Sequence, residues 1–485
     1  MRWLEKNKWQ VGLIALLVMV SYLNAIGAGF VADDVYGIVN NPEIFKFSWV
    51  IENPFIILGR LEYFIVSNLF GLSPWAFRLS NLLAHIGVSI LVFRLVGKLV
   101  NRRVGLMAGV LTAVHPMMIE SVTWISGGGY VKYSFWLLLA LILYIEGRKN
   151  NKWLIWSSLV YLMALQYSEK AMVLPAILIM YRLVFARKRK QWWDLAPFVV
   201  FGGTWIVSNL MQVGNRLEYL QTAYSSTGGG RGLSPLVQIP VAISEYLGLV
   251  LWPDKLSLYH SEMVFSKSAF LVRAILVGVL LLLGLWGLFK HFKGSKTWGR
   301  VSFWLGWLIV ALSPTLTPLG VSWIVAERYA YLGVIGIYVL MAMGVDWLRR
   351  KEGMKEGVMI GFGILVSLLM IRTMVRNSNW QTADKLWLSA KRTSPNSPQN
   401  NNNLGDYYGR MGDPAQAEKH FLKAIEINPN YAEAMHNLGN TYLQVGQFDK
   451  AKKYFNMALE LKPGLWQSTE QLKRLEEYLE KIERR

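Results

Sequence analysis

Long apolar runs recur over most of this 485-residue chain, and they restrict its fold more than any other feature. A helix needs roughly 17–25 residues to cross the hydrocarbon core of a membrane. The apolar content of 53% and the 21 Trp also favour a membrane protein over a soluble one. Eleven runs are expected to span, at about 9–27, 78–99, 104–120, 131–146, 153–168, 170–186, 194–211, 269–289, 301–319, 328–347 and 357–375.

Basic residues gather in alternate short loops between these runs, which is the distribution that places such loops in the cytoplasm. The net charge of +20 belongs mostly to this part, because the chain from Arg376 onward has 16 Lys/Arg and 13 Asp/Glu. The pattern favours the lipid bilayer, and not nucleic acid, as the partner of these charges. The clusters lie at 98–103, 148–152, 187–190, 290–300 and 349–355.

This orientation predicts a multi-pass protein of the cell (inner) membrane, with a cytoplasmic N-terminus and an extracytoplasmic chain after Arg376. It requires that 235–252, which contains Pro240 and Glu245, does not cross but is re-entrant or interfacial. The first run has no small-residue cleavage site before the acids that follow it, so we expect an uncleaved span. The chain has no Cys, which excludes structural disulfides and thiolate metal sites.

The last hundred residues change character and repeat with a period of 34. Small and large residues recur at fixed places, as in the helical hairpins of tetratricopeptide repeats (TPRs), where Pro ends the second helix. The matched pairs are Leu404/Leu438, Gly405/Gly439, Tyr408/Tyr442, Gly412/Gly446, Ala417/Ala451, Phe421/Phe455, Ala424/Ala458 and Pro429/Pro463. We therefore predict an all-α protein, a polytopic transmembrane bundle followed by a TPR solenoid.

The predicted domains follow from these patterns. Residues 1–375 form the transmembrane domain, 376–396 a half-repeat helix or linker, 397–464 two TPR repeats and 465–485 a capping helix. The concave face of such an array is suited to a protein partner.

Asp33 and Asp34 follow the first apolar run directly. Adjacent carboxylates are costly inside a bilayer but not at its surface, where they suit chemistry on a lipid-linked substrate. On position alone, a helix cap or a solvated loop is the commoner role of paired acids, and the later motifs add weight to the functional interpretation. Soluble-enzyme signatures such as a P-loop, G-x-S-x-G or H-E-x-x-H are absent from the sequence, and its six His are scattered.

Other polar residues fall at the outer ends of the runs. An anionic lipid headgroup needs such cations, and an attacking hydroxyl needs such a base. Taken singly, each is better explained as an interfacial anchor or a snorkelling side chain, but together they converge on one face of the membrane. The candidates for binding substrate or lipid phosphate are Arg60, His115, Glu120, Glu169, Lys170, Glu327 and Arg328.

The order of these motifs resembles the polytopic O-mannosyltransferases with C-terminal TPRs, in the GT-C glycosyltransferase superfamily. The resemblance runs through Ala32-Asp33-Asp34, Gly59-Arg60, Asn81-Leu82-Leu83-Ala84-His85, His115-Pro116 with Glu120, Trp124-Ile125-Ser126-Gly127, Ser168-Glu169-Lys170, Glu327-Arg328-Tyr329-Ala330-Tyr331-Leu332 and the repeats. Two departures stand out. Leu61-Glu62 replaces the family's Pro-Leu, and Gly127-Gly128-Gly129-Tyr130 replaces its Gly-Arg-Ala-Asp.

The resemblance implies a GT-C fold and a sugar, most often mannose, carried on a polyprenyl phosphate. Asp33 or Asp34 would deprotonate an acceptor hydroxyl, and Arg328 or Arg60 would stabilise the leaving phosphate, with inversion at the sugar. The acceptor would be Ser/Thr of a protein or, alternatively, a lipid-linked or envelope glycan. A divalent metal is compatible with paired acids but is not demanded. The non-enzymatic alternative is a membrane-anchored TPR scaffold, and a transporter is disfavoured because no repeated half is evident.

Overall fold

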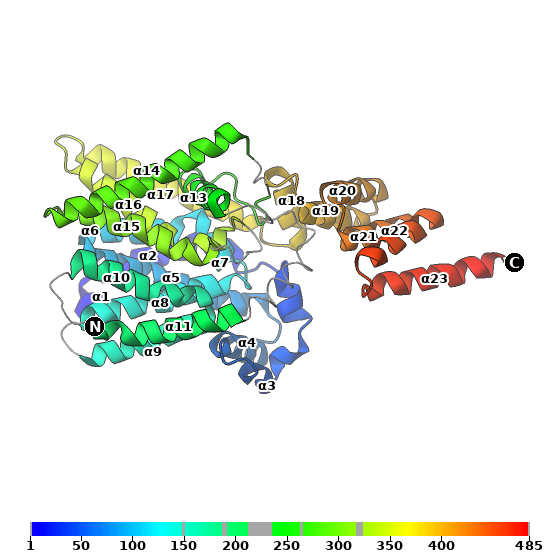
Figure 1. Cartoon of the computed structure of the whole chain (residues 1–485), viewed down its shortest axis with the longest axis horizontal. Coiled ribbons are helices and arrows are strands. Elements are labelled where there is room, and N and C mark those ends of the chain that lie inside the picture. The colour runs from blue at the N-terminus through cyan, green and yellow to red at the C-terminus, as the bar shows by residue number, and fades with distance from the viewer. Residues whose placement is uncertain are drawn as a thin grey trace.

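The structure, a computed structural model, describes residues 2–147, 151–186, 192–211, 235–261, 265–316 and 324–483. The basic clusters at 148–149 and 187–190 lie outside these residues. All regular elements within the described ranges are helices. Figure 1 shows two parts, a broad bundle of roughly aligned helices and a narrow array that projects from one end of it. The N-terminus lies at the opposite end of the bundle from this array.

The bundle consists of long helices with short helical turns between them. Its helices are α1 (Arg2–Lys6), α2 (Lys8–Tyr22), α5 (Pro74–Leu99), α6 (Arg102–Val114), α7 (Ile119–Val122), α8 (Gly128–Glu146), α9 (Asn151–Tyr167), α10 (Leu174–Phe185), α11 (Ala196–Met211), α13 (Pro235–Leu251), α14 (Lys267–Phe292), α15 (Lys296–Leu312), α16 (Val334–Arg349) and α17 (Lys355–Ser378). The short turns are η1 (Leu23–Ala25), η2 (Val35–Val39), η3 (Pro42–Phe45), η4 (Pro116–Met118), η6 (Glu169–Val173), η7 (Trp193–Leu195), η8 (Ser313–Thr315) and η9 (Glu327–Ala330).

Among the described residues, six helices are long and apolar enough to cross a membrane, or seven if α6 and η4–α7, bent by 59°, form one span. The predicted count of eleven is therefore not confirmed, although the predicted all-α membrane architecture is. Several predicted runs are helical but short, because turns such as η4 and η6 interrupt them. The apolar helix at Leu236–Leu251 is also shorter than a span.

The outer surface of the bundle is apolar, as expected where lipid replaces water. On α14, for example, Val272 is 65% exposed and Leu282 is 67% exposed. The interior is packed with large side chains, including the fully buried Trp304 and Trp307. Such a surface is compatible with lipid because the backbone N–H and C=O groups beneath it are hydrogen-bonded to each other within the helices.

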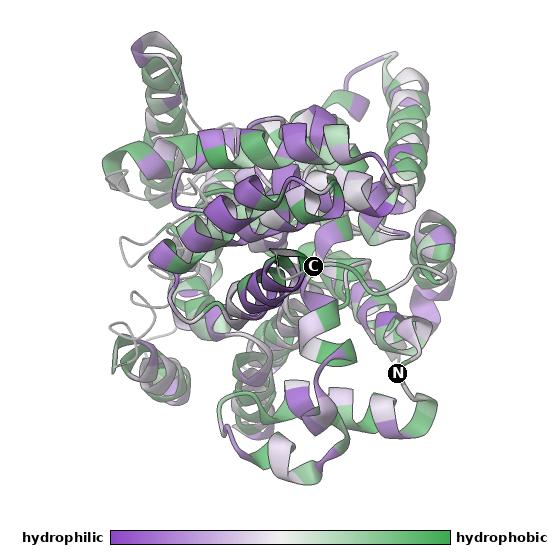
Figure 2. Ribbon diagram, turned by 90° about the vertical axis from the view of Figure 1, so that its right-hand side faces the viewer, coloured by the Kyte–Doolittle hydropathy of each residue, from purple (hydrophilic) through white to green (hydrophobic). Residues whose placement is uncertain are grey.

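The array begins with α18 (Ala383–Thr393), and α19 (Pro398–Arg410), α20 (Pro414–Ile427), α21 (Ala432–Gln444) and α22 (Phe448–Leu461) follow as two hairpins. A Cβ on Gly405 would lie 2.6 Å from the Phe421 ring, which explains why the repeat requires glycine there. The hairpin turns use Gly412 and Gly446, at φ +76° and +75°, where side chains are strained. The last helix, α23 (Trp466–Glu483), is mostly polar (Figure 2).

A long connection between α2 and α5 contains α3 (Phe47–Ile51) and α4 (Ile57–Phe70). It lies at the same end of the bundle as the array (Figure 1). The acidic pair begins this connection, and η4, η6 and η9 interrupt the bundle. These irregular segments carry the polar residues that the sequence singled out.

Candidate active site

Arg78, near the start of α5, holds the chain where it leaves the first span. Its guanidinium donates to the carbonyls of Ile26 (3.2 Å), Ala28 (2.7 Å) and Gly29 (3.0 Å). Its Nε donates to the carbonyl of Thr123 at 2.7 Å. A buried arginine that satisfies four carbonyls fixes a segment that has no regular hydrogen bonding of its own.

The end of the last span supports the same segment from the far end of the chain. Asn24 donates to the carbonyl of Met374 (2.7 Å), and the backbone N–H of Gly29 donates to the carbonyl of Gln381 (2.9 Å). Asn377 accepts a hydrogen bond from Thr123 at 2.7 Å. The loop that leads to the acidic pair is therefore held between α5 and α17.

Asp34 is fully buried, and both of its carboxylate oxygens accept hydrogen bonds from the protein. Its Oδ1 accepts hydrogen bonds from the N–H (2.8 Å) and the hydroxyl (2.5 Å) of Ser126. Its Oδ2 accepts a bond from the N–H of Val31 at 3.2 Å. Ala32, at φ +50°, has the one left-handed backbone among the described non-glycine residues. Backbone strain of this kind persists where neighbouring contacts enforce it, as Asp34 does here.

Asp33 differs from its neighbour. Its side chain is exposed and makes no hydrogen bond or ion pair with any described residue. The surrounding protein raises the pKa of Asp33 above its ordinary value, and the charge of Arg328 partly offsets this rise. Burial likewise raises the pKa of Asp34, which the hydrogen bonds from Ser126 oppose. Of the two acids, Asp33 has the free carboxylate.

Arg328 is the cation whose charge acts on Asp33, and Glu120 holds Arg328 in place. The two side chains form a buried ion pair, and the N–H of Arg328 also donates to Glu120 Oε2 at 2.9 Å. The guanidinium lies 5.2 Å from the Trp124 ring centre and 5.0 Å from that of Tyr329. Trp124 in turn donates to the carbonyl of Val31 at 3.3 Å, which links this group to the acidic loop.

Lys170 approaches the same aromatic group from η6. Its ammonium is 5.1 Å from the Tyr130 ring centre and 5.8 Å from that of Tyr329, and it pairs with Glu169 at 2.8 Å. Arg328 and Lys170 therefore flank Tyr329 with two positive charges. The structure brings together three segments that lie far apart in sequence, and they carry Glu120, Glu169 with Lys170, and Arg328.

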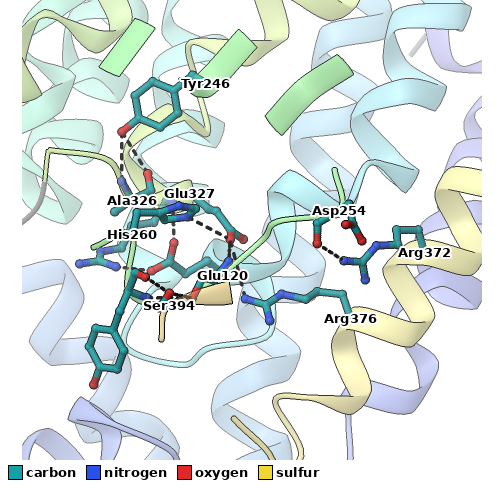
Figure 3. Close-up of polar contacts among 12 residues, drawn as sticks. Glu120, Tyr246, Asp254, His260, Ala326, Glu327, Arg372, Arg376 and Ser394 are labelled. Carbon is teal, nitrogen blue, oxygen red and sulfur yellow. Dashed lines mark hydrogen bonds and ion pairs between the residues drawn. The ribbon is translucent and has the colours of Figure 1, made fainter. Parts of the chain in front are cut away.

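Glu327 belongs to a buried polar cluster that includes His260, Arg376 and Ser394 (Figure 3). Its Oε1 accepts from the N–H of Ser257 at 2.6 Å and lies 3.5 Å from His260 and 3.7 Å from Arg376. Ser257 also hydrogen bonds to Ser394 at 2.7 Å, immediately before the TPR repeats. Glu327 thus positions the neighbouring Arg328 and connects it to the start of the array.

Two predicted residues lie apart from this group. His115 uses both ring nitrogens within the protein, Nδ1 to the N–H of Met117 (3.2 Å) and Nε2 to the carbonyl of Val250 (3.0 Å). Arg60 donates to the carbonyl of Trp49 at 2.5 Å and pairs with Glu52 at 3.1 Å. Arg60 lines a separate cavity of about 330 Å³, which Ser126 also lines.

Sequence reasoning missed Arg78, Ser126 and Arg376. Arg78 is the first residue of the predicted run 78–99 and lies inside α5, and a charge in a span is itself a signal of a structural or functional role. Ser126 stands in the motif Trp124-Ile125-Ser126-Gly127, but its role depends on a backbone fold that brings it to Asp34. Among the described residues, no group of three or more His, Cys, Asp or Glu is placed to hold a metal ion.

Gly127, shared with the pattern of the family that the sequence resembles, and Gly128, which stands where that pattern has Arg, both have a packing reason. A Cβ on Gly127 would overlap the carbonyl of Glu120, and one on Gly128 would overlap the Asn81 side chain. Asn81 reaches the same turn, donating to the carbonyl of Trp124 at 3.2 Å. The glycines therefore allow the segment with Ser126 to lie directly against α5 and Glu120.

Comparison with known proteins adds to this geometry. Residues 62–210 match the family described as dolichyl-phosphate-mannose-protein mannosyltransferase, and residues 396–463 match the tetratricopeptide repeat family. The chain is 22% identical to protein O-mannosyl-transferase TMTC3 of Mus musculus, over 82% of this chain and 49% of that protein. It is 24% identical to protein O-mannosyl-transferase F38B6.6 of Caenorhabditis elegans, over 85% and 62%.

The chain is O-mannosyltransferase-like and carries TPR repeats. It spans about half the length of TMTC3. Among solved structures, it is similar to ArnT from Cupriavidus metallidurans bound to undecaprenyl phosphate, with 14% identity, a TM-score of 0.45, and coverage of 93% of this chain and 80% of that one. It is also similar to the Archaeoglobus fulgidus oligosaccharyltransferase, with 15% identity, a TM-score of 0.43, and coverage of 84% and 59%.

Proposed function

We propose that this O-mannosyltransferase-like chain is an integral-membrane glycosyltransferase that moves mannose from a polyprenyl phosphate to an acceptor hydroxyl. The observation that carries the proposal is the free carboxylate of Asp33, which lies within the electrostatic influence of Arg328. A base and a phosphate-binding cation are the two groups that this reaction needs at one place. The mannosyltransferase family match at 62–210 supports the donor class.

The proposed step is a single displacement. The Asp33 carboxylate takes the proton of the acceptor hydroxyl, whose oxygen forms a bond to the anomeric carbon of the sugar. The bond from that carbon to the phosphate oxygen breaks, and the polyprenyl phosphate leaves with the electron pair. Attack opposite the leaving group inverts the anomeric centre. Asp34, occupied by Ser126 and Val31, acts as a positioning residue for its neighbour.

Arg328 and Lys170 are proposed to hold the phosphate. Each already has a carboxylate partner, Glu120 and Glu169, so each cation is fixed in place and retains N–H groups for a ligand. A preorganised cation stabilises the negative charge that grows on the leaving phosphate without reorganising during the reaction. Glu120, Glu169 and Glu327 are then supports for these cations.

The reaction is proposed to occur on the extracytoplasmic face. The acidic loop lies at the same end of the bundle as the TPR array, opposite the N-terminus (Figure 1). The basic loop clusters favour a cytoplasmic N-terminus, which would place this end outside. The array then stands beside the site, where its repeats are proposed to present a protein carrying the Ser or Thr acceptor.

The test is single-turnover release of polyprenyl phosphate by the purified full chain. The donor is polyprenyl-phosphate-mannose, and the acceptors are Ser/Thr peptides or a lipid-linked glycan. Asp33→Asn is expected to reduce the rate by roughly 10²–10⁴-fold, because a positioned base contributes about that much. Asp34→Asn retains an acceptor for Ser126 and is expected to cost much less.

Asp406→Asn, a substitution of an exposed acid in the array, serves as the matched control and is expected to leave the rate unchanged. Equal rates for wild type and Asp33→Asn would remove Asp33 from the mechanism. A complete loss confined to Asp34→Asn would assign the base to Asp34. No release by wild type with either acceptor class would contradict the transferase proposal and favour the TPR scaffold.

A further inference from the structure

A cavity of about 330 Å³ lies beside the acidic loop and is separate from the group around Arg328. Gly37, four residues after Asp33, lines it, and so does Ser126, which holds Asp34. The cavity is therefore one side chain away from the acidic pair. Its volume is at the small end of the roughly 300–1,000 Å³ that small-molecule pockets occupy.

Aromatic rings form part of the wall. Trp49, Tyr63 and Tyr167 line the cavity, and they come from α3, α4 and α9. Tyr63 is fixed by its hydroxyl, which donates to the carbonyl of Ile125 at 3.4 Å. Rings in a pocket give a ligand apolar faces to pack on, while the remaining groups decide its polar pattern.

The polar part of the wall is a buried ion pair. Glu62 and Lys132 contact each other, and their side chains are only 16% and 8% exposed. Ser80 also donates to Glu62 at 2.5 Å, so the carboxylate is held in one position. The cost of removing two charges from water offsets most of the attraction between them, so a buried ion pair adds little to stability. Stability therefore does not explain this pair, and ligand recognition does.

Gln166 supplies an unfilled hydrogen-bonding position in the same cavity. Its Nε2 donates to the carbonyl of Pro54 at 2.8 Å, which fixes the amide. Its Oε1 is buried and has no hydrogen-bond partner within the described structure. A buried acceptor without a partner is costly unless a ligand or a water donates to it. A hydroxyl group of a bound ligand is a suitable donor.

We infer that this cavity binds the ring of the transferred monosaccharide, an inference that rests on the proposed function. A pyranose has C–H faces that pack on aromatic rings and hydroxyls that pair with a carboxylate, an ammonium and an amide. The wall offers these groups, next to the loop that bears Asp33. Glu62, Lys132 and Gln166 are then the residues that determine which sugar is accepted.

The aromatic wall, and not charge, favours a sugar ring over a second phosphate in this cavity. Lys132 pairs with Glu62, and Arg60 pairs with Glu52 at 3.1 Å, while Trp49, Tyr63 and Tyr167 give the ring apolar faces to pack on. The phosphate of the donor would instead lie at Arg328 and Lys170. The acidic loop contributes to both places, with Asp33 in the field of Arg328 and Gly37 at the cavity.

The test measures binding without turnover, on the full chain in lipid nanodiscs. The probes are polyprenyl phosphate, polyprenyl-phosphate-mannose and polyprenyl-phosphate-glucose. Wild type is expected to bind the mannose lipid more tightly than the other two. Gln166→Leu removes one hydrogen-bond acceptor and is expected to weaken the preference for the mannose lipid about fivefold to tenfold. Its affinity for polyprenyl phosphate is expected to stay unchanged.

Gln444→Leu, at an exposed position in the array, is the matched control and is expected to bind as wild type. Equal affinity of wild type for all three lipids would overturn the inference. So would a Gln166→Leu variant that keeps its preference or loses affinity for all three lipids equally. A sugar preference lost in Gln166→Leu but accompanied by no transfer in wild type would support the cavity while contradicting the proposed function.

Discussion

The membrane bundle and the TPR array organise their glycines and polar residues in opposite ways. In the array, Gly405 and Gly439 recur 34 residues apart and do the same task, admitting the rings of Phe421 and Phe455. In the bundle, Gly127 and Gly128 occur once and admit Glu120 and Asn81, which belong to different helices. The array repeats one local solution, whereas the site in the bundle is assembled from distant segments.

This difference shows where the stability of each region comes from. Ion pairs in the array are largely exposed, such as Lys462 with Glu433. In the bundle site, by contrast, the pair of Arg328 with Glu120 is almost completely buried. Exposed pairs contribute little, but breaking a buried pair leaves an uncompensated charge. The same chemical change should therefore have unequal consequences in the two regions.

Substituting one arginine in each region is expected to give the largest difference in stability and transfer rate. Arg78→Met removes the donor that satisfies four carbonyls, and each unsatisfied buried group costs about 1–3 kcal/mol. We expect a loss of at least about 3 kcal/mol and a transfer rate at least ~100-fold lower, since the acidic loop loses its support. Thermal unfolding and single-turnover kinetics measure the two effects.

Arg410→Met is the control in the array, where Arg410 pairs with Asp384 and Asp406 at the surface. Its expected cost is about 0–1 kcal/mol, with no change in transfer. Comparable losses in the two variants would break the contrast between the regions.

Glutamate tests the contrast between ion pairs. Glu120→Gln leaves the buried Arg328 without its counter-charge, and we expect a loss of about 3 kcal/mol. Glu433→Gln, in an exposed pair with Lys462, is expected to cost less than about 1 kcal/mol. Thermal unfolding of both variants measures the difference. Adding Arg328→Met to Glu120→Gln should recover part of the stability but none of the transfer, and full recovery of both would contradict the role given to Arg328.

The pH dependence of the transfer rate also separates the two regions, and it is the prediction with the smallest expected effect near neutral pH. Partial desolvation by the surrounding protein favours the neutral form of both groups. It raises the pKa of Asp33, against the opposing charge of Arg328, and lowers the pKa of His420 to about 4. Only Asp33 must be charged for its proposed role. Transfer should therefore be complete above the pKa of Asp33 and fall as pH drops through it, beginning above the ordinary value of about 3.9.

The pH dependence of the single-turnover rate is the measurement, with near-UV circular dichroism to confirm that the fold persists. His420 stays neutral down to about pH 4, so it gains no charge in the folded array over this range. A rate that is independent of pH down to the ordinary carboxyl range would contradict Asp33 as the base.

The two regions also differ in how much of them could be predicted from sequence. The array followed from its period, because each repeat makes its contacts with near neighbours. The helical membrane architecture followed from apolar runs. The span count did not, because turns such as η4 and η6 shorten helices for reasons that depend on packing.

For the site, the sequence identified the acids and cations but not their relations. The sequence could not distinguish Asp33 from Asp34. In the structure, Asp34 accepts hydrogen bonds from Ser126 and Val31, whereas Asp33 does not. Glu120 and Arg328 are separated by 208 residues, so their pairing had no local pattern. The assignment of roles to these residues stays a prediction until the variants are measured.

Because the last span supports the acidic loop, the loop can reach its final structure only late in the synthesis of the chain. Asn24 and Met374, which hydrogen bond to each other, are 350 residues apart. A ribosome delivers the N-terminal partner long before the C-terminal one, and domains form as their parts emerge. The loop with Asp33 therefore completes its contacts only after nearly the whole bundle has been inserted. A chain that ends before Met374 contains the acids and Arg78 but lacks the contacts from the last span.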